Sequence, residues 1–116
     1  MYKLARELVA LTRGYEISIS ETHHEDKKDS PSGTALAIKQ VLLEADPELK
    51  VEIVSHRTGS AVGTHTISAI LGDDVVKIEH EALSRRSFAE GAIRAAEWIC
   101  GKTGCYNFSD IYPQLK

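Results

Sequence analysis

The spacing of the apolar residues changes along this chain, and the order of the changes limits the folds that the chain can adopt. Leu4, Leu8 and Leu11 recur at intervals of three to four residues, which predicts one apolar stripe on a helix. Gly14 then ends this helix. Residues 15–20 alternate between two faces, which is typical of a strand with one buried face. We therefore expect the chain to begin with a helix and a half-buried strand.

A second helix is expected after a polar stretch that follows this strand. Apolar residues recur at helical spacing over residues 34–45, and Ser32 is a suitable N-cap for them. Pro47 marks the far boundary of the helix, because proline cannot continue it. Alternating residues at positions 51–55 then predict a short strand.

The last part of the pattern predicts a hairpin and a final helix. Residues 62–83 alternate on both sides of Gly72-Asp73-Asp74, a sequence that favours a tight turn between two strands. Ser87 and Glu90 match a capping box, which predicts that a helix begins there. The predicted order is therefore helix, strand, loop, helix, three strands and helix.

This order predicts an α+β fold, with a mixed sheet of about four strands and helices on one face. A chain of 116 residues with 42% hydrophobic residues has room for one core, so we expect a single domain over residues 1–116. Strands that carry Ile and Val with one uncovered face are an association hazard for a monomer. We therefore expect the open face of the sheet to be used for oligomerisation.

The composition makes several classes of partner poor candidates. The net charge of −3 offers no basic surface of the kind that binds nucleic acid. The sequence shows no secretory signal and no apolar run of the roughly 20 residues that span a bilayer, so we expect a cytoplasmic protein without a membrane partner. Cys100 and Cys105 are too few for a disulfide scaffold, and we expect reduced thiols.

The polar stretch after the first strand contains three side chains suited to proton transfer. His23 and His24 exchange protons near neutral pH, and adjacent positions in an extended segment direct them to different sides. Lys27 can supply a positive charge or, when partly desolvated, a proton. This combination suits an anionic substrate that must be protonated.

The residues that precede the second helix suit an anion. The sequence Pro31-Ser32-Gly33-Thr34 leads into that helix, whose first backbone N–H groups lack partners within the helix. A carboxylate at this position would gain these donors and the helix dipole, and Gly33 would let it approach the backbone closely. The same sequence can also serve only as a helix cap, as surface histidines can be only solvated.

A metal site is not expected in this stretch. Adjacent histidines rarely bind one ion, and no His-x-x-x-His sequence follows. The residues considered for such a site are His23, His24, Glu25 and Asp26.

Nine of fifteen positions in this region resemble the signature of the dihydrodipicolinate reductases, also called 4-hydroxy-tetrahydrodipicolinate reductases. The similarity extends over nearly the whole chain, although Ser18 stands where the family often has an acidic residue. The similar segments are Glu21-x-His23-x-x-x-Lys27-x-Asp29-x-Pro31-Ser32-Gly33-Thr34-Ala35, Val62-Gly63-x-His65-Thr66 and His80-x-Ala82-x-Ser84-Arg85-x-x-Phe88-Ala89-x-Gly91-Ala92.

The resemblance implies a nicotinamide-dependent oxidoreductase of bacterial lysine and diaminopimelate biosynthesis. In this family, NADPH or NADH delivers a hydride to a cyclic dicarboxylated imine-type intermediate, a hydroxyl leaves as water, and tetrahydrodipicolinate forms. By position, His23 would be the proton donor and acceptor and Lys27 a second proton donor. His24 would contact the substrate, and Gly33 and Thr34 would hold a substrate carboxylate.

The resemblance also implies parts that this sequence lacks. Family members carry a dinucleotide-binding domain ahead of this segment, whereas no glycine-rich dinucleotide motif occurs here. We therefore expect no cofactor-binding residues in this chain, NADPH or NADH bound by the missing N-terminal domain, and no reductase activity of the chain alone. The family also implies a homotetramer.

Two questions stay open from the sequence. Arg85 can clamp a carboxylate at the rim of the same pocket, or it can be a surface arginine where the last helix starts. The chain as a whole can be the catalytic and oligomerising half of a reductase. Alternatively, it can be a stand-alone module that binds a dicarboxylate or only associates with itself, without catalysis.

Overall fold

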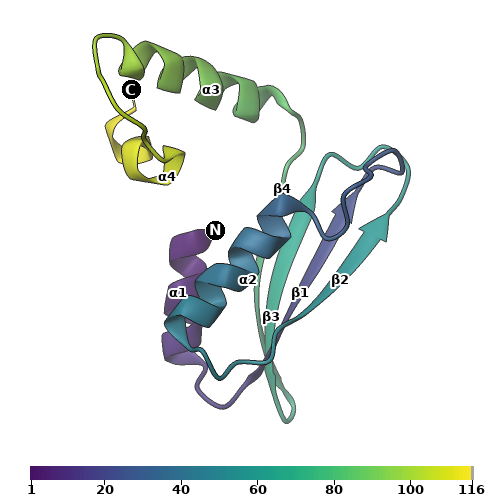
Figure 1. The fold of residues 1–116 in the computed structure, drawn as a ribbon. Helices are drawn as coiled ribbons and strands as arrows, with labels where there is room; N and C mark the ends of the chain where they lie inside the picture. The colour runs from purple at the N-terminus through teal and green to yellow at the C-terminus, as the bar shows by residue number, and fades with distance from the viewer. Residues whose placement is uncertain (116) are drawn as a thin grey trace. The chain divides into compact units, whose positions relative to one another are not determined.

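The computed structural model of the chain describes residues 1–115 (Figure 1). These residues form two compact units, one from Met1 to Leu83 and one from Ser84 onward. The first unit contains the sheet and the residues of the candidate site. The division into units does not test the expectation of a single domain over residues 1–116, which stays a prediction.

The first unit is a four-stranded mixed sheet with two helices. The strands lie in the order β2, β1, β3, β4, with β1 parallel to β2 and antiparallel to β3, and with β3 antiparallel to β4. This topology confirms the predicted α+β class. The elements are α1 (Tyr2–Leu11), β1 (Glu16–His23), α2 (Gly33–Ala45), β2 (Glu52–Arg57), β3 (Thr64–Leu71) and β4 (Asp74–Glu81).

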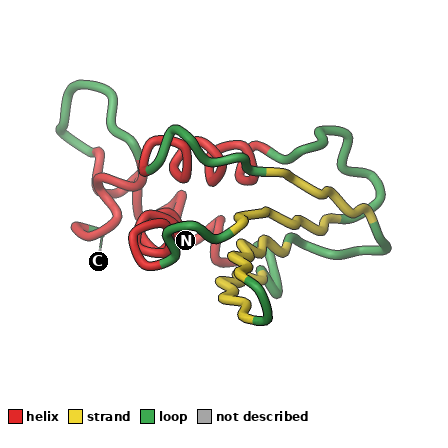
Figure 2. The backbone as a smooth tube through the Cα atoms, turned by 90° about the horizontal axis from the view of Figure 1, so that it is seen from below, coloured by secondary structure: helices red, strands yellow, loops and turns green. Residues whose placement is uncertain are grey.

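The core lies between one face of the sheet and the helices α1 and α2. The sheet is twisted, and its strands (yellow in Figure 2) run in different directions. Alternate residues of β1 and β3 point to the covered face, as the period of a strand requires. The buried apolar residues are Ala5, Leu8 and Val9 of α1, Ala35, Ile38 and Leu42 of α2, Ile17, Ile19, Ile67 and Ala69 of the sheet, and Val51 before β2.

On the covered face, the side chains change from apolar to polar toward the C-terminal end of β1. The strand register places residues of β2, β1 and β3 beside one another, so each row across the sheet has one chemical character. Successive rows contain Ile53, Ile19 and Ile67, then Ser55, Glu21 and His65, then Arg57 and His23. The candidate site is therefore the polar continuation of the core.

β1 is longer than the sequence predicts. The expected strand stopped at Ser20, whereas the observed strand runs on to His23, so the predicted loop from Glu21 was wrong at its start. β2 pairs with β1 as far as His23, and β3 pairs with it as far as Thr22. This pairing keeps the backbone of β1 extended beyond Ser20. Glu21 and His23 lie on the buried face despite their polarity, because they contact other polar groups there.

Two local predictions of the first unit are confirmed. The Ser32 hydroxyl accepts a hydrogen bond from the backbone N–H of Ala35 at 3.2 Å, so Ser32 is the N-cap of α2. β3 and β4 form the expected hairpin around Gly72 and Asp73. Gly72 has a φ of +57°, which a two-residue hairpin loop favours. Leu71 is exposed, because it lies at the loop end of the hairpin and away from the core.

The second unit contains α3 (Arg86–Ile99), α4 (Phe108–Ile111) and the 3₁₀ helix η1 (Tyr112–Gln114). The predicted capping box was wrong, because the helix begins before Ser87. The backbone N–H of Arg86 donates to the hydroxyl of Ser84 at 3.3 Å, and Glu90 pairs with Arg86 instead of returning to a cap. Cys100 and Cys105 are exposed free thiols. Among the helices of residues 1–115, none has the length and apolar character that crossing a membrane requires.

Candidate functional site

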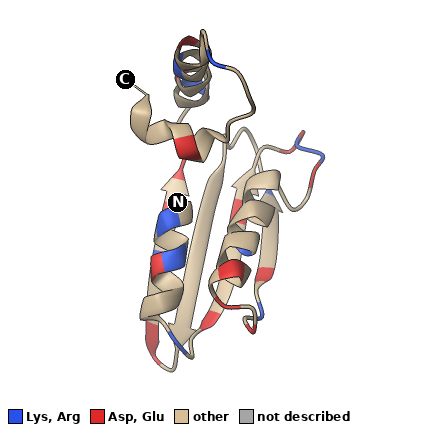
Figure 3. Ribbon diagram, turned by 60° about the vertical axis from the view of Figure 1, so that its left-hand side comes forward, with Lys and Arg blue, Asp and Glu red and all other residues tan. Residues whose placement is uncertain are grey.

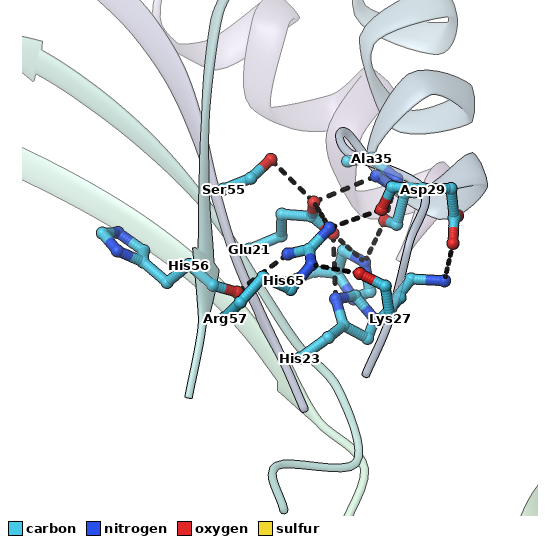
Figure 4. A network of polar contacts seen from close by, with 10 residues as sticks. Glu21, His23, Lys27, Asp29, Ala35, Ser55, His56, Arg57 and His65 are labelled. Carbon is cyan, nitrogen blue, oxygen red and sulfur yellow. Dashed lines mark hydrogen bonds and ion pairs between the residues drawn. The ribbon is translucent and has the colours of Figure 1, made fainter. Parts of the chain in front are cut away.

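A buried carboxylate, that of Glu21, lies at the centre of the polar rows (Figure 4). Its Oε1 atom accepts hydrogen bonds from the backbone N–H of Ser32 at 3.0 Å and from the hydroxyl of Ser55 at 2.7 Å. The guanidinium of Arg57 donates to the same oxygen at 3.0 Å. Burial would raise the pKa of Glu21, but these hydrogen bonds outweigh it and lower the pKa from 4.5 to about 2. Glu21 is therefore ionised at neutral pH.

The second oxygen of Glu21 faces two imidazoles. Oε2 lies 3.0 Å from Nδ1 of His23 and 3.8 Å from Nε2 of His65. The two rings meet edge to face, with their centroids 5.1 Å apart. Oε2 and Nδ1 are at ion-pair distance, but they do not form a hydrogen bond of good geometry, and neither atom has another hydrogen-bond partner among residues 1–115. The carboxylate oxygen Oε2 and the ring nitrogen Nδ1 are therefore each other's closest partner at ion-pair distance.

Both imidazoles are held in their neutral form by the site. Burial is the main cause that lowers the pKa of His23 and of His65 below 6.5. The charge of Lys27 lowers both pKa values further, whereas the charge of Glu21 raises both. At neutral pH each ring can therefore accept a proton at one nitrogen and donate from the other.

The other side of the His23 ring lies against a glycine. A Cβ atom at Gly63 would lie 3.0 Å from Nε2 and 3.2 Å from Cδ2 of His23. Cβ atoms essentially never approach other atoms this closely, so a larger residue at position 63 would force the ring to move. The backbone of Gly63 is therefore packed closely against the nitrogen of His23 that does not face Glu21.

The N-cap of α2 joins the polar rows to the start of the helix. The Ser32 hydroxyl lies 3.1 Å from Nε2 of His65 while it accepts from the N–H of Ala35. Gly33 and Thr34 follow directly and are exposed at the first turn of α2. The structure thus places the predicted carboxylate-binding residues next to the buried histidines.

Lys27 lies in the same cluster. Its ammonium group contacts a carboxylate oxygen of Asp29 at 2.8 Å, and this hydrogen bond is the main cause that lowers the pKa of Asp29. The backbone of Gly33 makes a smaller contribution that lowers the same pKa. A carboxylate of the chain therefore lies beside the predicted second proton donor, Lys27, and beside Gly33, which is predicted to hold a substrate carboxylate. Figure 3 shows both charge signs in the loop that carries these residues.

The other two residues with a predicted role are His24 and Arg85. His24 is half-buried directly after β1, and its carbonyl accepts from the backbone N–H of Lys27 at 3.2 Å. Arg85 is the N-cap of α3 and belongs to the second unit. Its predicted place at the rim of the pocket stays a prediction.

The sequence pattern predicted no role for Glu21, Arg57 or His65. Glu21 and His65 occur in the quoted motifs, and the two-residue spacing of Glu21 and His23 is the one local signal that they share a face. Arg57 continues the alternation of Ile53 and Ser55 on β2. That it contacts Glu21 follows only from the parallel pairing of β1 and β2.

Glu21, His23 and His65 could also hold a metal ion, because each offers one ligand atom and these atoms lie within 4.8 Å of one another. This group differs from the residues that the sequence offered for a metal site, which were His23 and the three residues that follow it. Part of the cluster is already engaged, Glu21 by Arg57 and His65 by Ser32. The arrangement is therefore better suited to proton transfer than to metal binding.

A surface depression of about 1160 Å³ lies elsewhere, toward the N-terminal end of β1. It is lined mainly by residues 14–18 and 46–52, and none of the candidate site residues lines it. Size alone does not indicate a function, and we assign no site to this depression.

The chain is similar to known proteins over almost all of its length. A family model described as "Dihydrodipicolinate reductase, C-terminus" matches residues 1–112. The 4-hydroxy-tetrahydrodipicolinate reductase of Rickettsia bellii is 39% identical over 97% of this chain and 50% of its own length. The protein of the same name from Methanosarcina mazei is 40% identical over 95% of this chain and 48% of its own. The chain thus spans about half the length of these relatives.

One solved structure supports the fold. It is described as a dipicolinate-bound dihydrodipicolinate reductase from Paenisporosarcina sp. TG-14, and it matches 79% of this chain and 42% of its own with a TM-score of 0.69. Its sequence is 24% identical to this chain. At this identity, the similarity shows that the two proteins share the fold of this segment.

Proposed function

The chain belongs to the dihydrodipicolinate reductase family and corresponds to its C-terminal part, and we propose that it supplies the substrate-binding and catalytic half of such a reductase. The proposed reaction converts 4-hydroxy-tetrahydrodipicolinate to tetrahydrodipicolinate. The observation that supports it best is that His23 and the N-cap of α2 meet at one buried carboxylate, with the charge of Lys27 close enough to lower the pKa of His23.

The reaction replaces a hydroxyl by hydrogen, so it consumes one hydride and one proton and releases water. The reduced nicotinamide cofactor would supply the hydride when it is bound. We assign the proton to His23, with Lys27 as a second donor. The neutral state of His23 at neutral pH supports this role, because such a ring takes up a proton and passes it on.

The substrate carries two carboxylates, and the chain offers groups that bind one. We assign this role to the backbone and hydroxyl at Gly33 and Thr34, with His24 as a further substrate contact. Asp29 supports the assignment, because its carboxylate is bound by Lys27 and its pKa is also lowered by the backbone of Gly33. A substrate carboxylate would compete with Asp29 for these groups and release Lys27 toward the reacting atoms.

The proposal also covers the nucleotide, the cellular location and the oligomeric state of the whole protein. NADPH or NADH would be held by residues outside this chain, and the protein would act in the cytoplasm. The open face of the sheet would form the contacts of a homotetramer. Val54, Ile70 and Val75 support an interface there, because they are exposed apolar residues of β2, β3 and β4.

A second candidate function is a module that binds a dicarboxylate without catalysis. The carboxylate-binding groups at the start of α2 favour it as much as they favour the reductase. The two candidates differ in their need for His23, because a binding module has no use for a buried proton donor beside Glu21.

Binding of pyridine-2,6-dicarboxylate to this chain tests the substrate site. We expect saturable NMR shifts that are confined to His23, His24 and residues 32–35, and weaker binding in Thr34→Val and Lys27→Ala. Lys28→Ala is the matched control, because Lys28 is an exposed neighbour of Lys27. The absence of shifts at millimolar ligand, or an equal loss in the control, would contradict a preformed substrate site.

A further inference from the structure

Glu21 is held so firmly that its second oxygen has a defined direction. Three donors, from Ser32, Ser55 and Arg57, bind Oε1 at distances of 2.7–3.0 Å. The side chain is fully buried, and its strand pairs on both sides at this residue. Because the rest of the carboxylate is fixed, Oε2 is held 3.0 Å from Nδ1 of His23, at ion-pair distance, although the two atoms do not meet in good hydrogen-bond geometry.

The chemistry of this contact restricts which nitrogen of His23 carries the proton. An ionised carboxylate can accept a hydrogen bond but cannot donate one. Next to Glu21, the favoured state of a neutral ring therefore has its hydrogen on Nδ1, since a bare Nδ1 would face a negative oxygen without a proton between them. In this tautomer Nε2 is unprotonated and can take up the proton that is to be transferred.

We propose that Glu21 is a positioning residue, which fixes His23 in the Nδ1–H tautomer and makes Nε2 the atom that exchanges a proton with the substrate. This proposal rests on the proposed function, in which His23 is the proton donor. It adds the residue that orients His23 and the ring atom that acts.

The surroundings of Nε2 agree with this assignment. Nε2 of His23 lies on the side of the ring that faces Gly63, a residue without a side chain. His65 packs edge to face against His23, and its Nε2 contacts the Ser32 hydroxyl at 3.1 Å. The ring of His23 is therefore flanked by Glu21 at one nitrogen and by His65 at its side, while the other nitrogen faces the backbone of Gly63.

Ser32 links the contact between Glu21 and His23 to the start of α2. It donates its backbone N–H to Glu21 and contacts His65 with its hydroxyl, and it caps the helix that begins with Gly33. The proposed proton-transfer residue and the proposed carboxylate-binding turn are thus tied to the same side chain, Glu21. If ligand binding moved the turn at Ser32, the position of Glu21 and with it the contact to His23 would change.

The tautomer of His23 can be measured directly in this chain by long-range proton–nitrogen NMR of the imidazole nitrogens. In the unsubstituted chain above the pKa of His23, we expect Nδ1 protonated and Nε2 bare. In Glu21→Gln, the amide N–H can take the place of Oε2 and donate to Nδ1, so we expect the hydrogen to move to Nε2. Glu16→Gln, which changes an exposed carboxylate of the same strand, should leave the tautomer unchanged.

The pKa of His23 is a second readout that a purely structural role of Glu21 would not move in this direction. Glu21 and Asp29 raise this pKa, whereas burial, Lys27 and Arg57 lower it. His65 also contacts the ring. Removing the charge in Glu21→Gln should therefore lower the pKa of His23 further, and Glu16→Gln should not change it.

The possible outcomes separate this proposal from the proposed function. An Nε2–H tautomer in the unsubstituted chain would overturn the proposal even if pyridine-2,6-dicarboxylate binds. An Nδ1–H tautomer that Glu21→Gln retains would overturn it as well. If Glu21→Gln does not fold, the tautomer of the unsubstituted chain decides alone. An Nδ1–H tautomer in a chain that binds no dicarboxylate would leave the positioning role intact and contradict only the substrate.

Discussion

The guanidinium of Arg57 donates a hydrogen bond of 2.6 Å to the backbone carbonyl of Asp29, a residue 28 positions earlier in the chain. The same side chain binds Oε1 of Glu21 at 3.0 Å and the carbonyl of Lys27 at 3.3 Å. Arg57 therefore holds the loop after β1 to the end of β2, and with it the proposed proton donor Lys27.

Replacement of Arg57 by lysine should loosen this loop. Lysine keeps the charge but loses the planar fork that reaches four acceptors, the fourth being the carbonyl of His56, so we expect Arg57→Lys to lower the free energy of unfolding by about 2 kcal/mol. Amide hydrogen exchange of residues 27–29 should become faster at the same time. Urea unfolding and hydrogen exchange measure the two effects.

Arg86 provides the matched control for this change. It forms an exposed ion pair with Glu90 at 2.8 Å, four residues along α3. We expect Arg86→Lys to change the stability by less than about 0.5 kcal/mol. Equal effects of the two substitutions would show that Arg57 is only another surface charge.

A methyl group at position 63 should disturb His23. In Gly63→Ala the new Cβ would start 3.0 Å from Nε2 of His23, so the ring must rotate or the backbone must shift. We expect a loss of about 1–3 kcal/mol in stability, as is usual for overpacking, together with shifted ring resonances of His23. Binding of pyridine-2,6-dicarboxylate should weaken.

Gly33→Ala is the control for this glycine substitution. A Cβ atom at Gly33 would meet nothing within 4 Å, and Gly33 is the first helical residue of α2. We expect its stability to stay the same or to rise by up to about 1 kcal/mol. A chain in which Gly63→Ala is as stable as Gly33→Ala and keeps the His23 resonances would contradict the close packing of Gly63 and His23.

Removal of the Ser32 hydroxyl should weaken α2 and its link to the site. Ser32→Ala loses the cap of the Ala35 N–H and the partner of His65. We expect a loss of about 1–2 kcal/mol in the free energy of unfolding. Ser20→Ala, on the other face of β1, should cost less. If the two substitutions had the same effect in urea unfolding, Ser32 would contribute only backbone contacts.

The stability of the chain should fall in acid for two reasons of the same sign. The pKa of Glu21 is about 2 in the folded chain instead of 4.5, so the unfolded chain binds the proton first as the pH falls. This stabilisation is fully present above about pH 4.5 and is lost toward pH 2, and it amounts to on the order of 3 kcal/mol. The lowered pKa values of His23 and His65 have the same effect below about pH 6.5.

Urea unfolding at several pH values measures this dependence. The difference in stability between the unsubstituted chain and Glu21→Gln should shrink as the pH falls from about 4.5 toward 2, since Glu21 becomes neutral there. Glu16→Gln should show no such convergence. A difference that stays constant with pH would contradict the ionised, hydrogen-bonded state of Glu21.

The sequence allowed most of the fold to be predicted, because the signals involved are local. The hairpin follows from alternation around Gly72-Asp73, and the start of α2 follows from the capping side chain of Ser32. The end of β1 was misplaced because Glu21 and His23 are polar, and polar residues at a strand end look like a loop. Whether such residues are buried depends on partners that lie on other strands.

The candidate site could be predicted only in part, for the same reason. His23 and Lys27 lie in one short segment with evident proton chemistry. Their environment is made by Arg57 of β2 and His65 of β3, which are 34 and 42 positions away from His23 in the chain. No local pattern brings these strands into register, so the buried network around Glu21 emerged only from the structure.

The most direct test of the proposed catalytic role is a reductase assay on this chain fused behind the half of the Methanosarcina mazei relative that it does not match, which we propose binds the nucleotide. With 4-hydroxy-tetrahydrodipicolinate as substrate, we predict substrate-dependent oxidation of NADPH or NADH. On the basis of general acid catalysis, His23→Gln should reduce kcat by about 10²–10⁴-fold while nucleotide binding persists. A folded, nucleotide-binding fusion without substrate-dependent oxidation, or with equal rates for His23→Gln, would contradict the assignment of this chain as the catalytic half.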